Sequence, residues 1–168
     1  MTITNNERIT NAITEIEFST VNLYQSFFEE HHVSFELMTI LYALLFYKNI
    51  TQKQICIKTR LPKQTVHNII NKLKAADFVY LIPNEDDRRE KFVILTPKGE
   101  QYGLEMIRPA SEINNMVAER MGIDFLSNLL KDLELYYHSI RMAQEIVSVS
   151  EEWSLMIENV LSNKQTKK

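Results

Sequence analysis

One stretch of the chain, residues 49–97, constrains the fold more than any other. It holds two short helical patterns separated by a proline, followed by two β-rich runs. Thr51 can cap the first helix, whose apolar positions are Ile55 and Ile57. Pro62 suits the first position of the second helix, because its backbone angle is fixed and it disfavours helix in the residue before it. The stretch therefore predicts a helix, a turn and a second helix.

The second helix, predicted over 62–76, has two unlike faces. The buried face is marked by apolar side chains at spacings of three and four, which are Val66, Ile69, Ile70 and Leu73. The opposite face carries Lys63, Gln64, Thr65, His67, Asn68, Asn71 and Lys72. Such side chains can read base edges and bind phosphates. A merely solvated face is the alternative, although such a face more usually shows Glu and Lys.

Two runs after this helix, 78–82 and 91–96, are rich in β-branched and aromatic residues and predict two short strands. The charged segment 83–90 between them predicts a hairpin loop. Helix, turn, polar-faced helix and two-stranded hairpin together make a winged helix-turn-helix.

The hairpin carries a pattern that resembles the MarR family of bacterial transcription regulators. The pattern is Asp87-Arg88-Arg89, then an alternating strand ending in Leu95-Thr96, then Lys98-Gly99. The resemblance covers roughly residues 9–146. It implies a mainly α fold with a small β-hairpin wing and with N- and C-terminal dimerisation helices. It also implies that Arg89, supported by Asp87, enters the minor groove from the tip of the wing.

The domain organisation follows from this reading. We expect one MarR-type domain over 5–149, with a DNA-reading lobe at 34–98 and dimerisation helices at 5–29 and 122–149. A C-terminal helical extension and tail would occupy 150–168.

The last long helix repeats apolar residues in alternating steps of three and four, at Leu126, Leu129, Leu133, Tyr136, Ile140, Ala143 and Val147. This heptad pattern indicates packing against partner helices, and hence a homodimer.

The charge distribution supports a nucleic-acid partner independently of the motif. The whole chain has a net charge of −3, but residues 48–98 hold eleven Lys or Arg and five Asp or Glu, a net +6. The remaining residues carry −9. Positive charge is thus concentrated in the segment that the pattern identifies as the DNA reader.

The sequence therefore predicts a homodimeric repressor on a pseudo-palindromic double-stranded operator. Gln64 and Asn68 are the expected base contacts, because each amide can bind adenine through two hydrogen bonds. The full set of expected DNA-binding residues is Lys53, Lys63, Gln64, Thr65, His67, Asn68, Lys72, Arg88, Arg89 and Lys91. The family's usual ligand site implies a small aromatic effector, in a pocket lined by Tyr24, Phe28, Phe35 and Tyr42.

Other classes of function find less support. The chain shows no Gly-rich phosphate loop, no nucleophile motif and no metal-ligand spacing, so we expect no enzyme, cofactor or metal. Cys56 is interpreted as a small buried core residue. Without a membrane span or signal-peptide core, the expected compartment is the cytoplasm. Two alternatives stay open: a winged helix for protein contacts without DNA, and a redox- or metal-sensing variant of the regulator.

Overall fold

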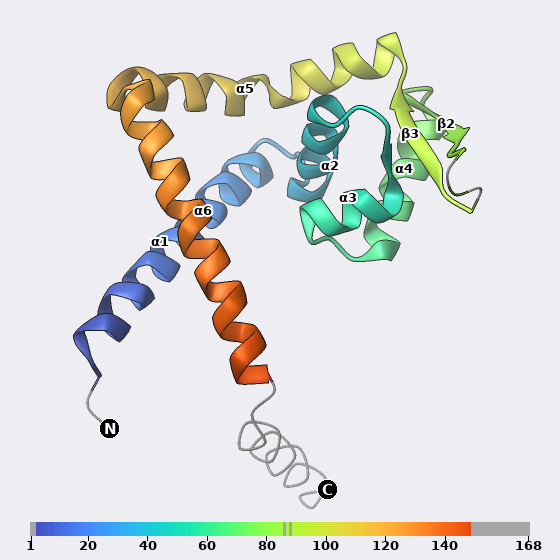
Figure 1. Ribbon diagram of the computed structural model, residues 1–168. Coiled ribbons are helices and arrows are strands. Elements are labelled where there is room, and N and C mark those ends of the chain that lie inside the picture. The colour runs from blue at the N-terminus through green and yellow to red at the C-terminus, as the bar shows by residue number, and fades with distance from the viewer. Residues whose placement is uncertain (1–2, 86, 88, 149–168) are drawn as a thin grey trace, which may run out of the picture. The chain divides into compact units, whose positions relative to one another are not determined.

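The computed structural model describes residues 3–85, 87 and 89–148 of the 168-residue chain. Its contacts divide the chain into two compact units, Met1–Ile113 and Asn114–Lys168. The helices and strands in chain order are α1 (Asn5–Glu30), α2 (Phe35–Phe46), β1 (Ile50–Thr51), α3 (Gln52–Thr59), α4 (Lys63–Ala75), β2 (Val79–Pro83), β3 (Lys91–Leu95), α5 (Pro97–Met121) and α6 (Ile123–Ser148) (Figure 1). The predicted mainly α fold class is confirmed.

The sheet has three antiparallel strands in the order β1-β3-β2. Ile50 of β1 and Leu81 of β2 both lie opposite Val93 of β3, whose side chain is buried. The prediction of a two-stranded hairpin was therefore incomplete. The strand that it missed has only two residues, and its second residue, Thr51, also caps the following helix, so no alternating run marks it in the sequence.

The core of the first unit is built around α2, as its nearly uniform apolar character predicts. Ile40 and Leu41 are fully buried, and Ile55 of α3 and Ile70 of α4 join them in one cluster. Phe46, at the last turn of α2, departs from this pattern with 62% of its surface exposed. Figure 1 shows α2, α3 and α4 gathered beside the sheet.

The ends of α3 and α4 have clear local causes. The Thr51 hydroxyl accepts the backbone N–H of Gln54, whose side chain accepts the Thr51 N–H, forming a capping box at α3. Helix α3 ends at Arg60 in the left-handed conformation, with φ 59°. Pro62 is the N-cap of α4 rather than its first helical residue, because its ψ of 143° is extended. Of the two apolar positions of α3, Ile55 is buried and Ile57 is exposed.

Helix α5 starts at a hydrogen-bonded junction behind the wing. The Thr96 backbone N–H donates to the Phe78 carbonyl at 2.9 Å, and the Thr96 hydroxyl accepts the Gly99 N–H at 2.9 Å. The ring of Tyr102 stacks on Phe78 with 4.3 Å between centroids. We expected Pro109 to kink α5 or mark a local break; no break occurs, since α5 continues through it to Met121.

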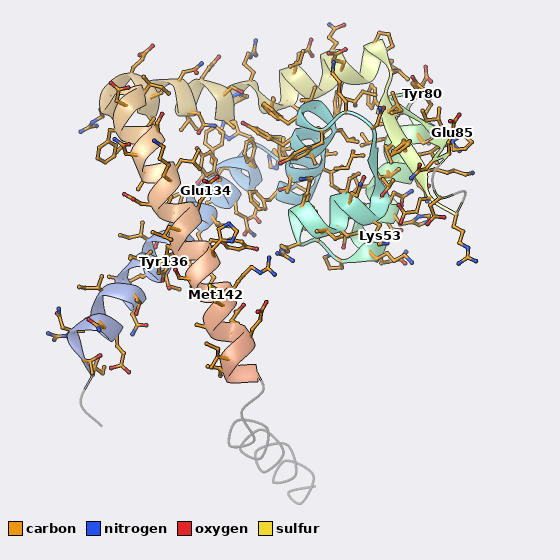
Figure 2. All side chains as sticks on the ribbon, in the orientation of Figure 1. Lys53, Tyr80, Glu85, Glu134, Tyr136 and Met142 are labelled. Atoms are coloured by element: carbon orange, nitrogen blue, oxygen red, sulfur yellow. The ribbon has the colours of Figure 1, made fainter. Side chains whose placement is uncertain are left out.

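In the second unit, Gly122 separates the end of α5 from α6 with φ +82°, as its position in the sequence predicts. Helix α6 presents exposed apolar side chains such as Met142 (Figure 2). Within the described part of the chain, no helix is long and apolar enough to cross a membrane. The predicted extension over 150–168 lies outside the described residues.

Candidate nucleic-acid interface

The outward face of α4 is built from carboxamide side chains. Val66, Ile70 and Leu73 are buried, which fixes the opposite face of the helix toward solvent. On that face Gln64 and Asn68 are both exposed, and the Gln64 Nε2 donates to the Asn68 Oδ1 at 2.9 Å. The contact joins residues one helical turn apart, so the two predicted base contacts form one continuous polar surface.

A second polar row runs beside this pair and connects α4 to α3. The Asn71 Nδ2 lies 2.9 Å from the His67 Nε2, and the His67 Nδ1 lies 3.4 Å from the Gln52 Oε1. All three side chains lie at least partly in solvent. The first residue of α3 therefore touches the polar face of α4 directly.

Asp87 holds the turn of the wing by accepting two backbone N–H groups, one through its side chain and one through its carbonyl. Its Oδ1 accepts the backbone N–H of Arg89 at 3.0 Å, and its carbonyl accepts the N–H of Glu90 at 2.9 Å. The backbone N–H of Asn84 donates to the Glu90 carbonyl at 3.1 Å and closes the loop. These bonds set the direction in which the chain leaves Arg89, whose side chain is exposed.

A groove of about 700 Å³ lies between α3, the start of α4 and the wing. Lys53 on α3 spans it to Glu90, with 3.3 Å between Nζ and Oε1 (Figure 2 labels Lys53). The groove is lined by Thr51, Gln52, Lys53, Cys56, Ile57, Lys63, Leu81, Asp87, Arg89, Glu90 and Lys91. Four of these are cationic and two are anionic, so its walls favour an anionic partner such as a phosphate backbone.

Comparisons with known proteins agree with this geometry. A model described as the MarR family matches residues 38–90, which span most of α2, then β1, α3, α4, β2 and the loop after β2. This segment is therefore similar to the MarR family. A comparison with curated proteins gave no significant match.

Solved structures extend the MarR likeness beyond the lobe. The MarR family regulator NMB1585 from Neisseria meningitidis is 25% identical, with TM-score 0.69, over 82% of this chain and 96% of its own. Staphylococcus aureus MepR in its DNA-binding conformation is 16% identical, with TM-score 0.64, over 79% and 98%. Streptococcus pneumoniae FabT in complex with DNA is 18% identical, with TM-score 0.58, over 83% and 99%. The last two show the fold alone.

The structure places Lys53, Lys63, Arg89 and Lys91 around the groove, and the other predicted DNA-binding residues that it describes lie on α4. Those on α4 are exposed except Thr65, which is half-buried, while Lys91 is exposed at the start of β3. Arg88 lies outside the described residues. Sequence reasoning missed Gln52 and Glu90, and it named Asn71 only as part of the polar face. The i, i+4 spacing of His67 and Asn71 was an available signal.

The remaining predicted residues lie elsewhere in the first unit. Phe28 is a core residue with 4% of its surface exposed, and the other three aromatic residues of the predicted effector pocket, Tyr24, Phe35 and Tyr42, are half-buried against that core. Cys56, expected to be buried, is half-buried, packing on the core while lining the groove. Among the described residues, no group of three or more His, Cys, Asp or Glu side chains is placed to hold a metal ion.

Proposed function

We propose that this chain is a MarR-type transcription regulator that binds double-stranded DNA as a homodimer. The observation that carries the proposal is the exposed carboxamide face of α4, with Gln64 and Asn68 in contact beside a groove with four cationic side chains. Carboxamides bind adenine edges in the major groove, whereas lysines and arginines bind phosphates. Arg89 on the wing reaches the neighbouring minor groove, where guanidinium groups are attracted to narrow A·T-rich sequence.

Exposed apolar side chains on α1 and α6 support the dimer. On α1, Ile9 and Ile16 are seven residues apart and both exposed. On α6, the heptad residues Leu129, Leu133, Ile140 and Val147 expose between 36% and 52% of their surface. Apolar rows of this extent mark association surfaces. Two copies related by a twofold axis place two α4 helices about 34 Å apart, which requires a pseudo-palindromic operator.

The regulator acts as a repressor whose DNA affinity is lowered by a small aromatic effector. The effector binds beside Tyr24, Phe28, Phe35 and Tyr42 and prefers dimers whose α4 helices are wrongly spaced for DNA. The half-buried rings against the core support this assignment. Titration of the protein–operator complex with aromatic acids tests it, since release of DNA must accompany binding. Aromatic acids that bind without releasing DNA would contradict it.

A salt titration of duplex binding tests the DNA function. Genomic fragments retained by the protein supply the duplex. Counterion release predicts a linear fall of log K with log salt, with a slope of several units for a dimer. Arg89→Ala should weaken binding about tenfold and lower the slope by about one per site. Lys131→Ala on α6 removes the same charge outside the lobe and should change neither quantity. Equal binding by wild type and Arg89→Ala would refute the role of the wing.

The same titration separates this function from a winged helix used for protein contacts. Such a module would retain duplex DNA weakly and without a steep dependence on salt. Retention of that kind, with no sequence preference, would contradict the proposed function.

A further inference from the structure

We infer that Gln52, the first residue of α3, is a positioning residue. Through His67 it determines which base edge the Asn71 carboxamide of α4 can bind. The inference rests on the proposed function, in which α4 reads DNA. It assigns sequence selection to a residue outside the recognition helix, through the row of contacts from Gln52 to His67 and on to Asn71.

The contacts favour one tautomer of His67. A neutral imidazole has one ring nitrogen that donates and one that accepts. The Gln52 Oε1 can only accept, so the His67 Nδ1, 3.4 Å away, carries the proton. The His67 Nε2 is then an acceptor, and it receives the Asn71 Nδ2–H at 2.9 Å. The two contacts are consistent with one tautomer, and the row ends at the exposed carboxamide of Asn71.

This row determines what Asn71 can offer to DNA. The Asn71 Nδ2 donates one of its two N–H groups to His67. In the arrangement we infer, this is the N–H on the side away from Oδ1, so the second N–H stays beside Oδ1. An N–H and a C=O side by side match adenine, since Oδ1 can accept the N6 amino group while Nδ2 donates to N7. The arrangement therefore prepares Asn71 for an A·T pair.

Without the Gln52 acceptor the preference weakens. The proton is then free to move to the His67 Nε2, which becomes a donor toward Asn71. The Asn71 carboxamide rotates to bring Oδ1 to that donor and turns both N–H groups away from the ring. Two donors match the acceptors of guanine or thymine as well as they match adenine N7, so discrimination among bases falls.

Nuclear magnetic resonance tests the tautomer without DNA. Ring ¹⁵N shifts are recorded at a pH near 8, where imidazole is neutral, and His67→Phe identifies the His67 signal among the four histidines. The wild type should show the proton on Nδ1. Gln52→Met removes the acceptor at similar size and should lose that signature, whereas Gln52→Glu keeps an acceptor and should retain it. A wild-type His67 with its proton on Nε2 would overturn the inference.

Base preference is then measured with operator duplexes carrying each base pair in turn. Replacing one A·T pair per half-site should weaken wild-type binding roughly tenfold. Gln52→Met should reduce that penalty to less than about threefold at this pair alone, and Gln52→Glu should restore it. The same substitution on α5, Gln101→Met, is the control and should leave the profile unchanged. If wild type and Gln52→Met show the same dependence of affinity on the base pair, the inference is contradicted while the proposed function stands. A wild type that binds no duplex would remove both.

Discussion

Among the glycines, Gly99 is the one at which an added methyl group should lower the free energy of unfolding most. It is the third residue of α5, directly behind the wing. A Cβ built there would lie 1.8 Å from the backbone oxygen of Phe78, 2.7 Å from its carbonyl carbon and 2.9 Å from its Cα. All three are backbone atoms, so no side-chain rotation relieves the overlap. The strand and the helix must move apart by more than about 1 Å to restore ordinary packing distances.

That movement disrupts identifiable interactions. The Phe78 carbonyl accepts the Thr96 N–H at 2.9 Å, and the Phe78 ring stacks on Tyr102. Loss of this part-buried hydrogen bond costs about 1–3 kcal/mol and overpacking a similar amount, while Ala gains about 1 kcal/mol over Gly in helix propensity. Gly99→Ala should therefore destabilise the protein by about 3 kcal/mol, a large part of the 5–15 kcal/mol typical of a domain. Urea unfolding at fixed protein concentration measures the loss.

The other two glycines are matched controls. At Gly103 an added Cβ meets only the flexible Leu45 side chain, at 3.2 Å, so Gly103→Ala should stay within about 1 kcal/mol of wild type. At Gly122 nothing lies within 4 Å, but φ is +82°, so Gly122→Ala should cost about 1–2 kcal/mol through backbone strain alone. A Gly99→Ala protein that unfolds at the wild-type midpoint would refute the reasoning.

Three further predictions concern helix ends. Thr51 is buried and caps α3, so Thr51→Ala should destabilise by about 1–2 kcal/mol in urea, and Thr51→Ser should recover most of it. Arg60 has φ 59°, so Arg60→Gly should raise the melting temperature through relief of about 1 kcal/mol of strain; an unchanged or lower value would contradict this. Hydrogen bonds from the Thr4 backbone N–H and then its hydroxyl lower the pKa of Glu7 below 4.5. Because the folded pKa is depressed, this stabilisation of α1 is full above pH 4.5 and lost as the pH falls through the lowered value. The amide shift of Thr4 should follow that titration, and a constant shift would exclude it.

Local signals in the sequence predict much of this fold. The Thr51 cap and the 3/4 spacing on α4 both involve residues within one or two turns, where periodicity and capping rules apply directly. The Asp87-to-Gly99 pattern located the wing and the start of α5. The clash at Gly99 gives this pattern a physical reason, since only glycine allows the helix to approach the Phe78 carbonyl.

The missed features depend on contacts between distant residues. Strand β1 forms because Ile50 pairs with Val93, and its two residues carry no sequence pattern that predicts this pairing. The contact from Gln52 to His67 joins residues fifteen positions apart on two helices, and it follows from how α3 packs on α4. Of the kink or local break predicted at Pro109, the break is absent, and the residues Ile107 and Ala110 on either side are buried.

Footprinting on the tightest-binding duplex recovered from genomic fragments tests the central claim most directly. Two dimer-related α4 helices and two wings should protect two blocks of backbone centred about 10 base pairs apart and related by a twofold axis. Minor-groove protection beside each block should disappear with Arg89→Ala. A single protected block, or no protection in dilute buffer at micromolar protein, would contradict the claim that two copies of this chain read DNA together.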